Sequence, residues 1–202
     1  MGLYVKQVYG CCLVLLLAVN NGWAQDTDQL LLEAVKARDF ATAEALLLQG
    51  TDVDAAQPDG ATALHWAVYH DTLVTADVLI SAGADVDASN DYGVTPLALA
   101  CENGSAVMVS RLLEAEANTQ VRRNSGETPL MTCARTGNVD AVKALLVHGA
   151  EANAVEAWQG QTALMWAVGE GHTEVAKTLI ERGADVSVRS KSGFSAILIG
   201  AR

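Results

Sequence analysis

The side chains with the clearest chemical potential in this 202-residue chain are four histidines, two pairs of alternating aspartates and two cysteines beyond residue 24. The histidines are His65, His70, His148 and His172. No nucleophile elbow, zinc-binding H-E-x-x-H, C-x-x-C, G-x-G-x-x-G or P-loop pattern accompanies them. The sequence therefore predicts no catalytic residues, no cofactor and no enzymatic activity.

The aspartate pairs, Asp52 with Asp54 and Asp85 with Asp87, place carboxylates at alternate positions, which could suggest calcium binding. They lack the glycine-centred twelve-residue loop that a calcium site of this type requires. Each pair also occupies the same place in a repeated unit. We therefore interpret them as structural residues and predict no metal site.

A repeated unit positions all of these residues. A glycine recurs at spacings of 33, 33, 34 and 33 residues, at Gly60, Gly93, Gly126, Gly160 and Gly193. A threonine or serine follows two residues later and a leucine or isoleucine four residues later. A complete unit has a threonine N-cap, an apolar helix, a turn, a second apolar helix and, in most copies, a glycine stop. A degenerate copy precedes the first of these glycines, as expected of a capping repeat, and the last copy is incomplete.

Cys101 and Cys133 fall in neighbouring copies of this unit. An oxidising compartment would permit a disulfide between them. Stacked helical layers lie about 10 Å apart, however, which exceeds the usual Cα separation of a disulfide. We therefore expect two small buried hydrophobic residues, with a disulfide as the alternative.

Residues 1–24 have the pattern of a secretory signal peptide. Lys6 precedes an apolar run from Val8 to Val19, which is short for a membrane span, and small residues precede a cleavage position before Gln25. An uncleaved anchor is the alternative. We expect export to the periplasm or the cell exterior, with no stable membrane anchor after cleavage.

The net charge of −11 argues against nucleic acid as the partner, because phosphate binding requires a basic surface. The charge is uneven. Residues 25–118 carry 3 basic and 16 acidic side chains, whereas residues 119–202 carry 9 and 8. An ordinary solvated helix surface also accounts for this pattern. We expect a monomer that binds protein.

The segments GATALHWA, GVTPLALA, GETPLMTCA and GQTALMWA resemble the G-x-T-P-L-H-x-A signature of ankyrin repeats, and the exported form resembles bacterial members. The resemblance implies an all-α ankyrin repeat solenoid, built of stacked helix–turn–helix units with β-hairpin-like fingers. Residues 25–202 would form the repeat domain. Its repeats are 26–58 (a degenerate cap), 59–91, 92–124, 125–157, 158–191 and a partial 192–202.

Three residues mark departures from, or matches to, the family pattern. His65 keeps the signature histidine, which in the family ties the helix start to the neighbouring loop. Glu116 replaces a glycine that should adopt positive φ, at a cost of about 1 kcal/mol. One extra residue before Gly160 predicts a bulged finger that pushes Trp158 outward.

The resemblance implies a non-catalytic scaffold that binds protein through finger tips and the ends of the first helices. The candidate residues are Trp66, Tyr69, His70, Tyr92, Glu102, Asn103, Glu127, Arg135, Trp158, Gln161, Trp166 and Glu170. Tyr69, Tyr92, Trp158 and Arg135 are favoured because aromatic and arginine side chains often anchor interfaces. Trp66 and Trp166 are equally compatible with packing between repeats. Alternative functions are a regulatory or inhibitory module of a longer protein, or a structural spacer.

Overall fold

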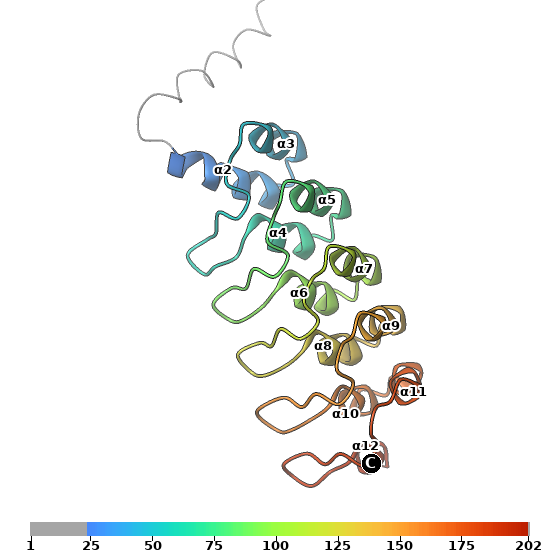
Figure 1. Cartoon of the computed structure of the whole chain (residues 1–202). Coiled ribbons are helices and arrows are strands. Elements are labelled where there is room, and N and C mark those ends of the chain that lie inside the picture. The colour runs from blue at the N-terminus through green and yellow to red at the C-terminus, as the bar shows by residue number, and fades with distance from the viewer. Residues whose placement is uncertain (1–23, 202) are drawn as a thin grey trace, which may run out of the picture.

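The computed structural model describes residues 24–201, in which eleven helices, five pairs and a final single helix, stack into an elongated array (Figure 1). The expected signal peptide lies outside the described residues. The inner row is α2 (Ala24–Lys36), α4 (Ala63–Tyr69), α6 (Pro96–Glu102), α8 (Pro129–Thr136), α10 (Ala163–Gly169) and α12 (Ala196–Gly200). The outer row is α3 (Phe40–Leu48), α5 (Leu73–Ser81), α7 (Ala106–Glu114), α9 (Val139–Val147) and α11 (Thr173–Glu181). None of these helices is long and apolar enough to cross a membrane.

Long loops, here called fingers, project beside the inner helices between one pair and the next (Figure 1). In the finger before α6, the amide of Asn90 donates to the Val94 carbonyl at 3.1 Å, which closes the loop. Over residues 24–201 the only β pairing is an isolated antiparallel bridge between Ala56 and Thr62. The expected all-α solenoid is therefore confirmed, and its fingers are hydrogen-bonded loops without strands.

Local sequence explains where the inner helices begin. The hydroxyls of Thr95, Thr128 and Thr162 accept hydrogen bonds from amides three residues ahead, at 3.3–3.4 Å. Pro96 and Pro129 occupy the first helical position, where the lack of an amide proton costs nothing. The repeated leucines bury the inner face and are at most 1 % exposed: Leu64, Leu97, Leu130 and Leu164. A single elongated core results, because each helix pair covers its neighbour.

His65 links two repeats through a buried, neutral imidazole. Its Nδ1 accepts from the Thr62 amide at 3.2 Å, and its Nε2 lies 3.0 Å from the Val94 carbonyl oxygen. Since a carbonyl can only accept, Nε2 carries the proton. Burial lowers the pKa of His65, although the Val94 carbonyl and the Asp59 carboxylate act in the opposite direction. The tie expected between helix start and neighbouring loop is confirmed.

This lowered pKa predicts that the protein loses stability in mild acid. The stabilising contribution of neutral His65 is complete above its unfolded pKa of about 6.5 and is lost as pH falls through the folded pKa. We expect the free energy of unfolding, measured with urea, to fall from pH 7.5 to pH 5, by less in His65→Gln. His148→Gln is the matched control, since His148 is exposed. Equal pH dependence in all three proteins would contradict the assignment.

Glu116 adopts the left-handed backbone conformation expected from its place in the repeat, with φ of +65°. Gly83, Gly149 and Gly183 hold the same place, and a Cβ added there would meet nothing within 4 Å. The conflict at Glu116 is thus one of backbone preference and not of space. We expect Glu116→Gly to raise the free energy of unfolding by about 0.5–1 kcal/mol, after the entropy of the added glycine is subtracted. Glu116→Ala retains the strain, and urea unfolding should show no comparable gain.

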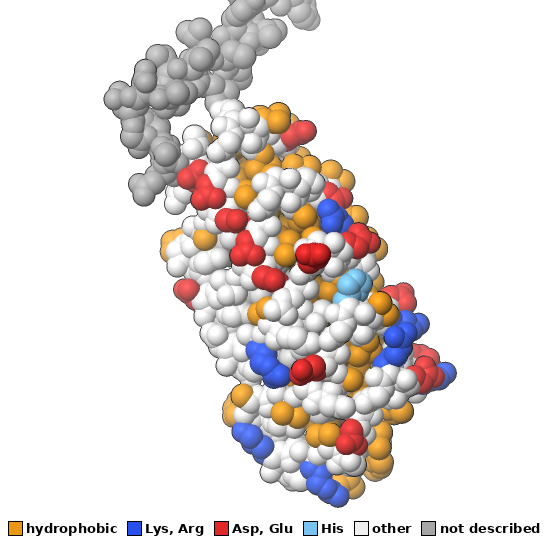
Figure 2. Space-filling model, in the orientation of Figure 1, with side chains coloured by type: hydrophobic (Ala, Val, Ile, Leu, Met, Phe, Trp, Pro, Cys, Tyr) orange, Lys and Arg blue, Asp and Glu red, His pale blue; other side chains and the backbone are white. Residues whose placement is uncertain are grey.

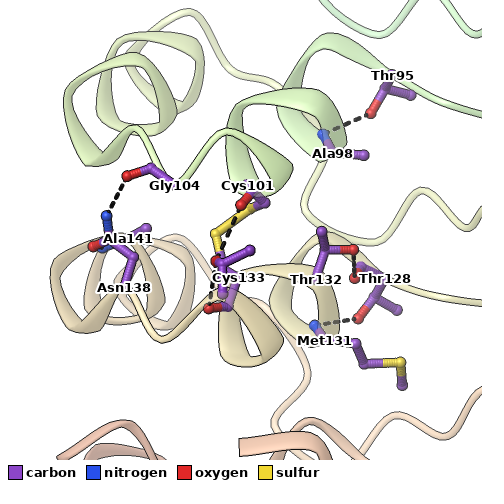
Figure 3. Close-up of a disulfide and its surroundings, with 11 residues drawn as sticks. Thr95, Ala98, Cys101, Gly104, Thr128, Met131, Thr132, Cys133, Asn138 and Ala141 are labelled. Atoms are coloured by element: carbon purple, nitrogen blue, oxygen red, sulfur yellow. Dashed lines mark hydrogen bonds between the residues drawn. A yellow bond between two sulfur atoms is a disulfide. The ribbon is translucent and has the colours of Figure 1, made fainter. Parts of the chain in front are cut away.

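Cys101 in α6 and Cys133 in α8 form a disulfide, which corrects the expectation of two separate thiols (Figure 3). Their Cα atoms lie 4.6 Å apart, and both residues are fully buried. The spacing of about 10 Å on which that expectation rested is the distance between the axes of stacked helices. Small side chains on the facing sides of two adjacent helices come much closer than the axes do. The disulfide therefore fits between the third and fourth repeats.

Candidate binding groove

The candidate site is the surface formed by the fingers and the ends of the inner helices, here called the groove. Equivalent residues from successive repeats form a row along it, here called the groove row: Tyr69, Glu102, Arg135 and Gly169. The next residue in each repeat lies beside the row: His70, Asn103, Thr136 and Glu170. These positions contain most of the helix-end candidates, and the structure shows that their surroundings differ from repeat to repeat.

An aromatic cluster occupies the N-terminal end of the groove. Tyr69 packs edge-on to Trp66, with ring centroids 5.6 Å apart, and to His70 at 5.2 Å. The ammonium of Lys36 lies 5.0 Å from the Trp66 ring centroid, as in a cation–π contact. Trp66 is half-buried, whereas Tyr69 is 59 % exposed. Tyr69 is therefore the residue of this cluster that a partner can reach most easily.

Residues beside the groove row bind the preceding repeat. His70 Nε2 lies 3.2 Å from the Lys36 carbonyl oxygen, and the Asn103 amide donates to the Val68 carbonyl at 2.8 Å. Thr136 makes the same type of bond to the Cys101 carbonyl at 3.1 Å. Different side chains thus satisfy the last carbonyls of the preceding helix. His70 and Asn103, which the sequence suggested for partner binding, have these polar groups engaged in stacking the repeats.

An ion-pair cluster occupies the middle of the groove. The Arg123 guanidinium, on a finger, lies 2.7 Å from the Glu102 carboxylate and 3.8 Å from that of Glu127. The Arg123 side chain is only 15 % exposed. Glu102, one of the predicted binding residues, therefore holds this finger against α6. Glu127, another of them, pairs with Arg123 within the same finger, so the two carboxylates share one guanidinium.

Among residues 24–201, the two most exposed large aromatic side chains lie at finger tips. Tyr92 is 69 % exposed and Trp158 is 79 % exposed, which confirms the predicted outward position of Trp158. The buried carboxylate of Glu156 holds its longer finger by accepting the amides of Trp158 at 2.5 Å and Gln161 at 2.8 Å. Sequence reasoning missed Glu156. Asn90 accepts amides in the same way in a finger of 33-residue spacing, from Tyr92 and Val94 at 3.0 Å, so a polar acceptor at this place in a finger was the signal.

A hollow lies at the C-terminal end of the groove, with a volume of about 510 Å³. Trp166 forms part of its wall, and its indole Nε1 donates to the Gln161 side-chain oxygen at 2.9 Å. The Arg135 guanidinium carbon lies 5.8 Å from the Trp166 ring centroid. Glu170 is exposed at the same hollow. Four of the predicted residues, from two repeats, are thus brought together here.

Acidic and basic side chains are distributed unevenly on the side of the molecule that carries the fingers. Acidic side chains gather on the finger side of the upper repeats, and basic side chains on that side belong to the lower repeats (Figure 2). The alternating aspartates accept backbone amides. Asp54 accepts from the Asp85 amide at 2.8 Å, and Asp87 from the Asn118 amide at 2.8 Å, each in the next repeat. These carboxylates therefore connect the repeats, as the structural interpretation predicted.

A sequence model of the family described as "Ankyrin repeats (3 copies)" matches residues 15–123 and 107–190. The two matches overlap and together include most of the chain, with the aromatic cluster, the ion-pair cluster and most of the hollow. No curated protein sequence matches the chain.

Proposed function

The chain belongs to the ankyrin-repeat family, whose repeats generally mediate protein–protein interaction, and we propose that it is a non-catalytic protein-binding scaffold exported to an oxidising compartment. The partner would lie along the groove and contact several fingers at once. Because the fingers are already held by backbone hydrogen bonds and by Glu156, little conformational entropy would be lost on binding.

The observation that carries the binding proposal is the exposure of Tyr92 and Trp158 on ordered fingers. Large aromatic side chains contribute strongly to interfaces, and both lie at loop positions that no packing requirement explains. The amide of Lys191 also donates to the Gln159 carbonyl at 2.7 Å, which fixes the finger of Trp158 against the following finger. These side chains therefore project from a fixed surface.

Paired capture experiments test this proposal. The exported chain and its Tyr92→Ala/Trp158→Ala variant serve as bait for exported proteins of the same cells. We expect a protein retained by the parent chain to bind the variant at least about tenfold more weakly, since each anchor contributes about 1 kcal/mol or more. Leu48→Ala, at an 84 % exposed site on outer helix α3, is the control. Equal retention by all three baits would contradict groove binding through these fingers.

The disulfide supports the proposed location, because such bonds persist mainly in oxidising compartments. Mass spectrometry of the chain from its native cells tests this proposal separately. We expect an N-terminus at Gln25 and a linked Cys101–Cys133 peptide. A chain that retains residue 1 and carries free thiols at Cys101 and Cys133 would contradict export.

A further inference from the structure

The hollow at the C-terminal end of the groove, here called the C-terminal pocket, is lined by Gly169, the one member of the groove row that has no side chain. Tyr69, Glu102 and Arg135 place large side chains at this position in earlier repeats. Gly169 is helical without positive φ, and a Cβ added to it would meet only Ile199, at an ordinary contact distance of 3.7 Å. Neither the backbone nor the available space therefore requires a glycine here. Its absent side chain leaves the pocket open.

The walls of the C-terminal pocket combine apolar surface with one available cation. Met165, Trp166 and Phe194 supply the apolar surface, whereas Gln159, Gln161 and Ser192 add polar groups. Arg135 is exposed, and none of the four ion pairs among residues 24–201 includes it. Arg123, in contrast, lies between two glutamates.

The local charge favours an anionic ligand. Lys191 and Arg189, on the finger next to the C-terminal pocket, donate to the backbone carbonyls of Ala157 and Gly193, so no carboxylate neutralises them in these contacts. Glu170 is the acidic side chain of the pocket wall, and the nearby Glu156 is buried and accepts backbone amides. The repeats toward the N-terminus carry an excess of acidic side chains, with 16 acidic and 3 basic residues in 25–118. A carboxylate is therefore repelled there and attracted here.

We propose that the C-terminal pocket receives a carboxylate-bearing peptide segment of the partner, with the carboxylate against Arg135 and a neighbouring apolar side chain against Trp166. Arginine suits this role because its planar guanidinium binds a carboxylate through two parallel hydrogen bonds. The volume of about 510 Å³ accommodates two adjacent side chains. This inference rests on the proposed protein-binding function and names one feature of the partner.

Peptide titration followed by the indole N–H signals of ¹⁵N-labelled chain tests the proposal. The probes are acetyl-Gly-Leu-Glu-Gly-amide, its Gln counterpart, and acetyl-Gly-Gly-Leu with a free terminal carboxylate. We expect the Glu peptide to shift the Trp166 signal saturably below about 10 mM, and about tenfold more tightly than the Gln peptide. Stronger binding of the third probe would assign the carboxylate to a chain terminus. The Trp66 signal is the internal control.

Two variants distinguish the contribution of the open pocket volume to binding from that of the Arg135 charge. Gly169→Tyr reproduces the residue that α4 carries at Tyr69 and should abolish the Trp166 shift while the fold is kept. Arg135→Gln should leave the Glu and Gln peptides equal. Equal binding of both peptides to the parent chain, equal shifts at Trp66, or no saturable shift would overturn the proposal. If the paired baits still differ, the groove function stands and only the pocket inference fails.

Discussion

Replacing the disulfide by Val at Cys101 and Ala at Cys133 is expected to lower the free energy of unfolding by about 3–4 kcal/mol. The two cysteines are separated by 32 residues, and a cross-link over a loop of this length removes about that much conformational entropy from the unfolded chain, in energy units at 25 °C. The chosen residues are those that other repeats carry. Val68 and Val168 correspond to Cys101, and Ala67, Ala100 and Ala167 to Cys133. The variant therefore removes the cross-link with little change in packing.

Urea unfolding of three samples isolates the covalent contribution. These are the oxidised parent chain, the parent chain refolded in reductant, and the Cys101→Val/Cys133→Ala variant. We expect the last two to agree within about 0.5 kcal/mol and both to fall below the first. A variant as stable as the oxidised parent would show that the disulfide adds nothing. A variant much less stable than the reduced parent would instead indicate a packing defect.

The repeat architecture could be predicted because its determinants are local and recur in register. A threonine cap, a buried leucine and a glycine stop each act within a few residues, so five imperfect copies specify one fold. The disulfide could not be predicted in this way. Sequence gives the spacing between layers, whereas the Cα separation depends on which residues of two helices face one another.

The location of the groove could be predicted from the sequence, whereas the roles of several of its side chains could not. Glu102 and His70 stand at variable positions, yet each contacts a residue at least 21 positions away, and only the stack reveals these contacts. Tyr92 and Trp158 are exposed as expected because a finger tip has no neighbour to cover them. The C-terminal pocket depends on the lack of a side chain at Gly169. The ligand proposed for it could be inferred only once the structure placed Gly169 beside Arg135 and Trp166.

Substitution of Gly137 by alanine is the second change expected to have a large effect, with a loss of about 3 kcal/mol in the free energy of unfolding. Two costs combine at this site. The backbone has φ of +79°, which strains any residue with a Cβ. The added Cβ would also lie 2.6 Å from the His172 imidazole, whose Nε2 lies 2.9 Å from the Arg135 carbonyl oxygen. Relieving the clash would therefore break a bond between the fourth and fifth repeats.

Gly104 and Gly171 provide matched controls, because they hold the same place in other repeats. Both have positive φ, but a Cβ added to either would meet nothing within 4 Å, so alanine there should cost only about 1 kcal/mol. Asp71, at the same place with φ of +51°, shows that this turn accepts a side chain where space is open. In a His172→Ala background, Gly137→Ala should fall to the cost of the controls, as a double-mutant cycle measured by urea unfolding would detect. An unchanged cost in that background would assign the whole effect to the backbone and contradict the proposed clash.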